Sequence, residues 1–130
     1  MRGDEIDIPL SEEEKKEKIE FLKKKKLSDF QIHPYFNRDS YIKHGVEIDN
    51  IKEIYPQFDK IIAIFKRPAK KGYKYSFVYQ LEEVKSLVIC FYLDENPPKL
   101  FNAYFDYTRQ GNKLKKKVEK WMKKEANKLQ

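Results

Sequence analysis

KIIAIFKRPAKKGYKYSFVYQLEEVKSLVICFYLDENPPKLFNAYFDY, residues 60–107, is the stretch that decides the fold of this chain. Apolar and polar side chains alternate along it with a period of two, which predicts β-strands. The predicted strands are residues 60–66, 73–81, 86–93 and 99–107, and residues 27–37 are expected to form either a loop or one edge strand through Phe30 and Ile32. Short, polar connections join them, at residues 67–72, 82–85 and 94–98. Because short connections join antiparallel neighbours, we expect a four-stranded antiparallel meander.

The same alternation assigns the strand side chains to two faces of the expected sheet. One face is largely aromatic and aliphatic: Tyr73, Tyr75, Phe77, Tyr79, Leu81, Leu87, Ile89, Phe91, Phe101, Ala103 and Phe105. The other face is mixed: Lys74, Ser76, Val78, Gln80, Val88, Cys90, Tyr92, Asn102, Tyr104 and Asp106. We expect the first face to meet helices and the mixed face to carry any functional surface, because its polar groups can meet a ligand.

Capping signals predict helices on both sides of this sheet. Ser11 and Glu14 form a capping box, in which each side chain satisfies a backbone donor at the start of a helix. The expected helices and their caps are 12–26 after Ser11, 41–44 after Asp39 or Ser40, 50–55 after Asp49, and 113–129 after Asn112. Apolar residues keep helical spacing in the last of these, so one stripe of it packs while its lysines stay in water.

These elements predict an α+β fold, with N-terminal helices, a four-stranded antiparallel meander sheet and a C-terminal basic helix. At 130 residues and 40% hydrophobic content, the chain has enough material for one domain. Its expected parts are an irregular arm at 1–10, a helical part at 11–58, the sheet at 59–108 and the basic helix at 109–130.

The positive charge of the chain lies in its last 22 residues. Residues 109–130 hold nine Lys and Arg against two Glu, a balance of +7 that equals the net charge of the whole chain. A basic helix on a neutral sheet suggests a polyanion partner, most often nucleic acid, although a lysine run is also typical of a solvated helix face. The expected nucleic-acid-binding residues are Lys70, Lys71, Arg109, Lys113, Lys116, Lys117, Lys120 and Lys124.

Several kinds of site and location have no support in the sequence. One cysteine and two histidines exclude a disulfide framework and leave no zinc constellation, and four glycines form no phosphate-cradling loop. Cys90 lies in an apolar run and is expected to be a buried free thiol. We expect no metal, no cofactor and no membrane attachment, and a cytoplasmic location. Abundant Lys, Glu and Ile lean towards a thermophile.

The order of helices, meander and closing helix resembles that of the RelE/barnase/EndoU-like nucleases, in particular small RelE-type toxins. The residues that carry the resemblance are His33, the turn Lys43-His44-Gly45-Val46, Ile51 and Ile54, Lys66-Arg67, and Gly72-Tyr73-Lys74-Tyr75. It extends over residues 32–107, and this chain departs from the group in its long Lys-rich final helix and its capped first helix. Proteins of this group cut RNA without a metal ion, so the resemblance implies a ribonuclease that needs no cofactor.

Carried over by position, the resemblance implies the catalytic residues His33, Lys66, Arg67, Lys74 and Tyr104. Cleavage of this kind needs a base, an acid and cations for the charge that develops on phosphorus. His33 titrates in the right range, but beside Pro34 it also suits a surface loop. Lys66-Arg67 and Lys70-Lys71 can bind phosphate or simply solubilise a hairpin tip.

Three functions follow from these observations. The first is a RelE-like toxin or RNA-directed ribonuclease that acts without metal. The second is a non-catalytic nucleic-acid-binding domain that uses the C-terminal helix, with RNA favoured over DNA. The third is an interaction module for an acidic partner protein, such as an antitoxin, which the same lysines would bind.

Overall fold

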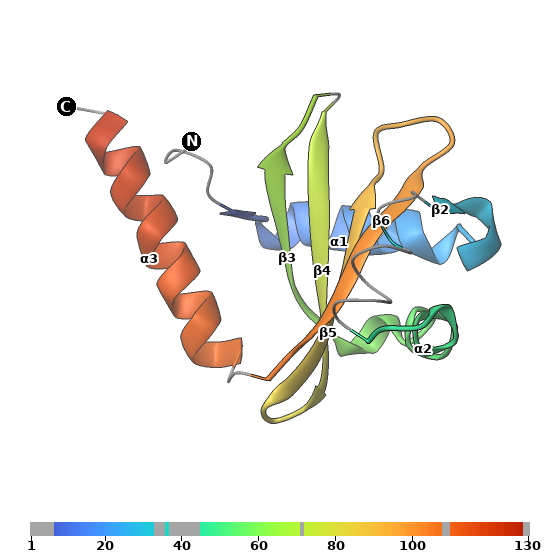
Figure 1. The fold of residues 1–130 in the computed structure, drawn as a ribbon. Helices are drawn as coiled ribbons and strands as arrows, with labels where there is room; N and C mark the ends of the chain where they lie inside the picture. The colour runs from blue at the N-terminus through green and yellow to red at the C-terminus, as the bar shows by residue number, and fades with distance from the viewer. Residues whose placement is uncertain (1–6, 33–35, 37–44, 71, 108–109, 129–130) are drawn as a thin grey trace.

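The structure, a computed structural model, describes residues 7–32, 36, 45–70, 72–107 and 110–128. These residues form an α+β fold with three α-helices and a six-stranded mixed sheet (Figure 1). In chain order the elements are β1 (Ile8–Pro9), α1 (Glu12–Lys23), the 3-10 helix η1 (Leu27–Asp29), β2 (Gln31–Ile32), α2 (Ile48–Ile54), the 3-10 helix η3 (Phe58–Lys60), β3 (Ile61–Pro68), β4 (Tyr73–Glu82), β5 (Lys85–Tyr92), β6 (Lys99–Asp106) and α3 (Gln110–Lys128). The strand order in the sheet is β1-β3-β4-β5-β6-β2.

The four predicted strands are present as β3 to β6, each within two residues of its expected bounds. They pair antiparallel in chain order, so they form the predicted meander. The expectation of a four-stranded, purely antiparallel sheet is nevertheless wrong, because two edge strands extend it. The sheet has six strands and is mixed.

The two edge strands are each two residues long. β1 comes from the arm that we expected to be irregular, and it pairs antiparallel with β3, where Ile8 lies opposite Lys66. Pro9 suits this position, because an edge strand needs no donor on its outer side. At the other edge β2 pairs parallel with β6, and the backbone N–H of Gln31 donates to the carbonyl of Pro98 at 2.9 Å. Pairings this short leave no periodic pattern in a sequence.

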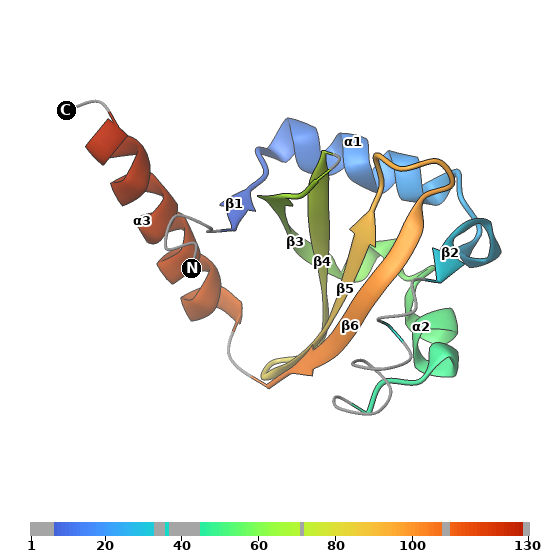
Figure 2. The same ribbon diagram turned by 45° about the horizontal axis from the view of Figure 1, so that its top comes forward.

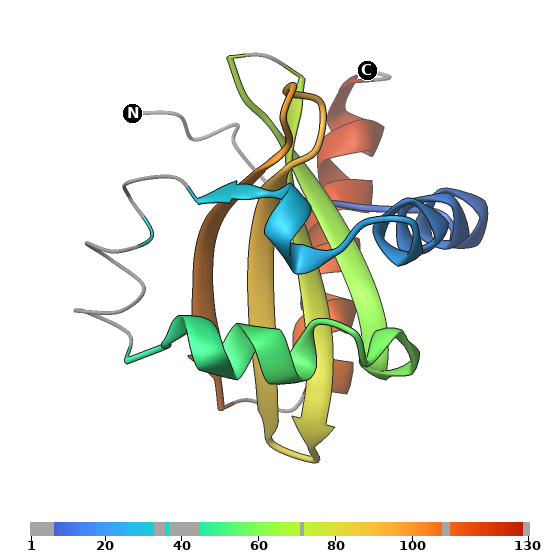
Figure 3. The same cartoon turned by 90° about the vertical axis from the view of Figure 1, so that its right-hand side faces the viewer.

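The aromatic face of the sheet packs against α1 and α2 and forms the main hydrophobic core. Its fully buried side chains include Phe77, Tyr79 and Phe91 from the sheet, Leu22 from α1 and Ile51 from α2. Figure 2 shows α1 running across the strands, and Figure 3 shows α2 on one side of the sheet and α3 on the other. The sheet thus separates α3 from the other two helices.

The opposite face of the sheet, on the side of α3, carries a smaller buried cluster. Its members are Ala63, Phe65, Val78, Val88 and Cys90, with Ile62, Phe101 and Tyr104 packed against them. The sequence places Phe101 on the aromatic face, and this is wrong. The register of β5 and β6 shifts between Cys90 and Phe91, so that Leu100 pairs with Phe91 and Asn102 with Cys90. Phe101 is the extra residue of this bulge, and it joins the smaller cluster.

Helix boundaries agree with the capping signals in one case of three. Ser11 caps α1 as predicted, its Oγ accepting from the backbone N–H of Glu14 at 3.2 Å, although the helix ends three residues early, at Lys23. In contrast, α2 is capped by Glu47, and α3 begins at Gln110, before its predicted cap. The short helix predicted over residues 41–44 lies outside the described residues.

Candidate nucleic-acid interface

The structure divides the predicted catalytic residues between the two faces of the sheet. Lys66 lies on the α1 face, where its Nζ is 3.3 Å from Glu14 Oε2 and 4.8 Å from the ring centre of Tyr73. Tyr104 lies on the α3 face, packed against the smaller cluster. His33 lies outside the described residues. Because the sheet separates Lys66 from Tyr104, these two side chains do not act at one centre.

Arg67, Lys74 and Tyr104 share the α3 face. Arg67 and Lys74 lie directly opposite each other on β3 and β4. The Nζ of Lys74 lies 5.5 Å from the ring centre of Phe101 in the smaller cluster. Burial, and then the nearby Cys90 and Asp7, raise the pKa of the Tyr104 hydroxyl. Tyr104 is therefore protonated at neutral pH, which suits a hydrogen-bond donor or an acid and not a base.

Asp7 joins two cations on this face. Its Oδ1 accepts from Arg67 Nε at 3.1 Å and lies 3.0 Å from a terminal nitrogen of the same guanidinium. Its Oδ2 accepts from Lys117 Nζ of α3 at 2.6 Å. We call these two ion pairs the Asp7 bridge. It connects the N-terminal arm, β3 and α3, which lie far apart in the sequence.

The Asp7 bridge is partly withdrawn from water. The side chain of Asp7 is 18% exposed, that of Lys117 27% and that of Arg67 36%. Burial acts to raise the pKa of the Asp7 carboxyl, but the hydrogen bonds and charges of Lys117 and Arg67 together outweigh it, and the pKa lies below its ordinary value. Below the bridge, Lys117 Nζ lies 4.5 Å from the ring centre of Phe65. Asp7 is therefore ionised at neutral pH.

Four lysines share one side of α3. We call them the lysine flank: Lys117, Lys120, Lys123 and Lys124. At 3.6 residues per turn, their positions span an arc of about 120°. Trp121 lies next to this arc and Val118 lies about 100° beyond its edge; both are half-buried, whereas Met122 is 58% exposed. The prediction that an apolar stripe packs while the lysines stay in water is therefore confirmed only in part, because Met122 is exposed and Lys117 is partly buried beside Asp7 and Phe65.

Two lysines of the flank are exposed and unpaired. Lys120 and Lys123 make no ion pair with any residue that the structure describes, and both are exposed. Lys70, at the tip of the β3–β4 hairpin, is likewise exposed. The side chains of Lys113 and Lys116 lie outside what the structure describes, as do Lys71 and Arg109. The exposed charge thus comes from both α3 and the hairpin.

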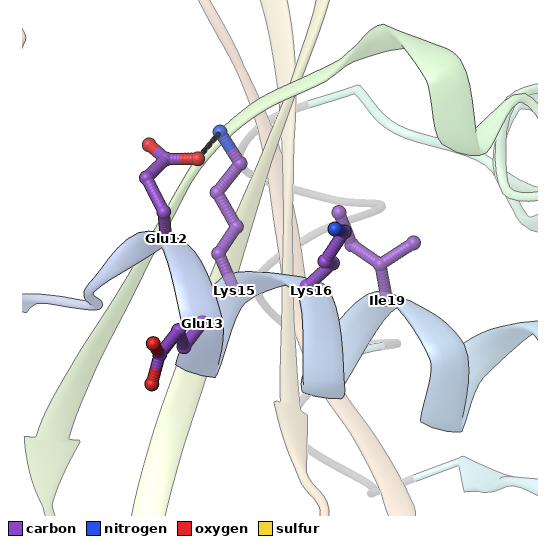
Figure 4. Close-up of a pocket in the computed structure, with 5 residues that line it drawn as sticks. All are labelled: Glu12, Glu13, Lys15, Lys16 and Ile19. Atoms are coloured by element: carbon purple, nitrogen blue, oxygen red, sulfur yellow. Dashed lines mark ion pairs between the residues drawn. The ribbon is translucent and has the colours of Figure 1, made fainter.

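A shallow hollow on the surface of α1 offers no competing site. Its lining is Glu12, Glu13, Lys15, Lys16 and Ile19, all from one helix (Figure 4). Lys15 pairs with Glu12 at 3.7 Å, and its Nζ also donates to the carbonyl of Ile62 at 3.4 Å. The mixed charges compensate one another, so this hollow does not favour an anion or a cation.

The described residues contain no group of three or more His, Cys, Asp and Glu side chains able to hold a metal ion. Cys90 is a buried free thiol, as predicted, and burial raises its pKa. A thiol in this state is a poor nucleophile.

Sequence reasoning missed Asp7. Its two partners are 60 and 110 residues away along the chain, and no local pattern links them. The separation of Lys66 from Arg67, in contrast, was available from the sequence, because adjacent residues of a strand point to opposite faces. No protein-family model matches the chain, and neither a curated protein nor a solved structure matches it. Within the described part of the chain, no helix is long and apolar enough to cross a membrane.

Proposed function

We propose that this protein binds nucleic acid through the lysine flank of α3, and that RNA is the favoured ligand. The observation that carries the proposal is the pair of exposed cations at Lys120 and Lys123, which make no ion pair with the described residues and lie next to Lys117 and Lys124 on one side of a helix. Cations that make no internal ion pair remain available to neutralise phosphates. The preference for RNA over DNA comes from the resemblance to RelE-type toxins.

The dimensions of the flank suit a run of phosphates. Lys117 and Lys124 are separated by seven residues, which is about 10 Å along a helix axis. Phosphates of one strand of a duplex follow one another every 3.4 Å or so along its axis, so the flank is long enough for about three of them. Lysine contacts of this kind read charge and not base sequence. The proposed binding is therefore strong at low salt and indifferent to sequence.

Fluorescence anisotropy with a labelled single-stranded RNA tests this proposal. We expect the logarithm of the affinity to fall linearly with the logarithm of KCl concentration over about 50 to 200 mM. Replacing both Lys120 and Lys123 by Gln should lower the affinity at low salt by about tenfold, and should reduce the salt slope by about one to two. A DNA of the same sequence, run beside the RNA, measures the preference between the two.

The matched control changes the same charge on the other side of the sheet. Lys16 of α1 and Lys24, the C-cap residue of that helix, are also exposed and form no ion pair with the described residues. Replacing both by Gln should leave RNA binding nearly unchanged. Equal losses from the two double variants would mean that net charge, and not the flank, determines binding. The absence of RNA binding by wild-type protein at low salt would reject the proposal outright.

A second candidate function, RelE-like cleavage of RNA without metal, is favoured by the sharing of one face by Arg67, Lys74 and Tyr104. In this proposal the two cations stabilise the charge that develops on phosphorus, and the protonated Tyr104 supplies a proton to the leaving oxygen. Its raised pKa leaves the hydroxyl protonated at neutral pH but makes it a weaker acid than an ordinary tyrosine, so this role depends on the strong basicity of the leaving alkoxide. Lys66 takes no part, since it lies on the opposite face.

Incubation of the purified protein with labelled RNA in EDTA tests the second candidate. We expect Tyr104→Phe and Lys74→Gln to slow cleavage by at least about a hundredfold, and Lys66→Gln to leave it unchanged. Cleavage that persists at the wild-type rate in Tyr104→Phe would assign the activity to a contaminant or to another site. Binding without cleavage would leave the first proposal as the function.

A further inference from the structure

The two cations of the Asp7 bridge converge on one anionic group, the carboxylate of Asp7. Arg67 offers a planar fork of donors and Lys117 a compact charge, and the two grip opposite oxygens of one carboxylate. A fork and a point charge that converge in this way are typical of protein sites for phosphate. Lys74 adds a third cation on the same face, because it is the cross-strand partner of Arg67 on the neighbouring strand β4.

The present occupant of this site is held by few contacts of its own segment. Asp7 immediately precedes β1, which is only two residues long and pairs with β3 alone. Just after it, the backbone N–H of Leu10 donates to the carbonyl of Ile64 at 3.1 Å, and α1 begins two residues later. A short edge strand of this kind opens more readily than the central strands do. Asp7 can therefore leave its partners while the central strands of the sheet keep theirs.

The surroundings fit a phosphate as well as a carboxylate. The ring of Phe65 lies below Lys117 and holds its stem, while the guanidinium of Arg67 remains about one-third exposed. Two cations carry more charge than one carboxylate neutralises, so the site keeps a net positive charge that attracts the phosphates of a polyanion. The site also adjoins the lysine flank, since Lys117 belongs to both. A strand that runs along the flank thus arrives at Arg67.

We propose that Arg67 and Lys117 form a phosphate-binding site, that the carboxylate of Asp7 occupies it in the free protein, and that a phosphate group of the bound nucleic acid displaces Asp7. This inference rests on the proposed function only for the source of the phosphate. The carboxylate imitates the ligand, so it competes with the phosphate for Arg67 and Lys117 and weakens its binding. The alternative is that the Asp7 bridge only fastens α3 to the sheet.

Tripolyphosphate is a probe that needs no nucleic acid. We expect Asp7→Asn, in the full-length chain, to bind it about tenfold more tightly than wild type, because the competing charge is removed. The gain should disappear in Asp7→Asn combined with Arg67→Gln. The matched control is Asp59→Asn, which also removes an exposed negative charge that makes no ion pair with the described residues. Equal affinities in Asp7→Asn and Asp59→Asn would overturn the inference.

A second measurement keeps the inference testable if Asp7→Asn does not fold. In wild-type protein, the carboxyl 13C resonance of Asp7 should move towards the position of a solvated aspartate as tripolyphosphate is added. A resonance that stays fixed while the probe binds elsewhere would show that Asp7 is not displaced.

RNA separates this inference from the proposed function. We expect Asp7→Asn to bind RNA more tightly than wild type and to show a salt slope larger by about one. Asp7→Asn could bind tripolyphosphate more tightly than wild type while neither protein binds RNA. This result would retain the phosphate site and reject the proposed function. RNA binding that is the same in wild type and Asp7→Asn would retain the function and reject the site.

Discussion

At the scale of single residues, Gly72 has the most demanding position. It adopts a φ of +83°, and an added Cβ would lie 2.9 Å from both Cβ and Cγ of Asp94. Asp94 in turn accepts a hydrogen bond from the backbone N–H of Tyr73 at 3.1 Å. Gly72→Ala should therefore lower the free energy of unfolding by about 2 to 3 kcal/mol, through backbone strain and loss of this hydrogen bond. Urea denaturation measures the loss.

Gly45 provides the control for this substitution. Its φ is +68°, but nothing lies within 4 Å of an added Cβ. Gly45→Ala should therefore cost only the backbone strain, about 1 kcal/mol. Equal losses at the two positions would show that Asp94 moves away without cost.

In contrast to the glycine substitutions, a substitution at Ser86 should stabilise the protein. Its side chain is fully buried, and its hydroxyl has no hydrogen-bond partner within the described part of the chain. Burial removes the hydrogen bonds of a hydroxyl to water, and without a protein partner no hydrogen bond replaces them. Ser86→Ala should raise the free energy of unfolding by about 1 kcal/mol. Ser76→Ala, which removes a hydroxyl 3.4 Å from Cys90 Sγ, should bring no such gain, and a loss of stability in Ser86→Ala would contradict the argument.

At the scale of elements, a relay of tyrosines fastens the end of α1. The hydroxyl of Tyr55 lies 3.0 Å from the carbonyl oxygen of Leu22 and 3.1 Å from that of Lys25. The hydroxyl of Tyr79 donates to the backbone carbonyl of Tyr55 at 3.0 Å. The carbonyl of Leu22 also accepts from the backbone N–H of Lys25 at 2.9 Å, and Lys25 lies just beyond α1, so the hydroxyl of Tyr55 adds a hydrogen bond at the C-terminal end of the helix.

Tyr55→Phe should consequently lower the free energy of unfolding by about 1 to 2 kcal/mol. Hydrogen exchange of the last turn of α1 should accelerate more than that of the central strands. Burial, and then the charge of Asp29, raise the pKa of Tyr55, so the loss should not vary with pH below about 10. Tyr73→Phe serves as the comparison, because the hydroxyl of Tyr73 has no hydrogen bond to a described residue. Equal effects of the two substitutions would contradict the relay.

The elements also show where prediction from this sequence succeeds and fails. Period-two alternation located β3 to β6, because each is eight or more residues long and half of its side chains enter a core. It could not locate β1 and β2, whose two-residue pairings depend on distant partners. It misplaced Phe101, because a bulge shifts the face of a side chain without leaving a mark in local composition.

The candidate site also has parts that the local sequence pattern predicts and parts that depend on distant residues. The lysine flank was predictable, because helical spacing alone gathers lysines on one side of α3. The grouping of Lys66 with Tyr104 failed, since it required knowledge of which face each residue occupies. The Asp7 bridge could not be predicted, because it depends on how a two-residue strand places one carboxylate between β3 and α3.

At the scale of the whole molecule, α3 has no fully buried side chain among those that the structure describes, whereas α1 and α2 contribute Leu22 and Ile51 to the core. It packs mainly against β1, and Lys117 is its contact with the ring of Phe65. The Asp7 bridge therefore supplies a charge-assisted connection at a place where hydrophobic packing is limited. It follows that the attachment of α3 should depend on the ionisation of one carboxylate.

Asp7→Asn should lower the free energy of unfolding by about 1 to 2 kcal/mol at pH 7, because the bridge is partly buried and its hydrogen bonds involve charged groups. The pKa of Asp7 is lowered in the folded protein, so this stabilisation is fully present above the ordinary aspartate pKa of about 3.9 and is lost as pH falls through the folded value. Urea denaturation at pH 7 and near pH 3, with hydrogen exchange of α3, measures both effects. The difference between wild type and Asp7→Asn should be smaller near pH 3 than at pH 7, while Asp59→Asn should match wild type at pH 7. A difference of the same size at both pH values would mean that Asp7 stabilises α3 by packing and not by its charge.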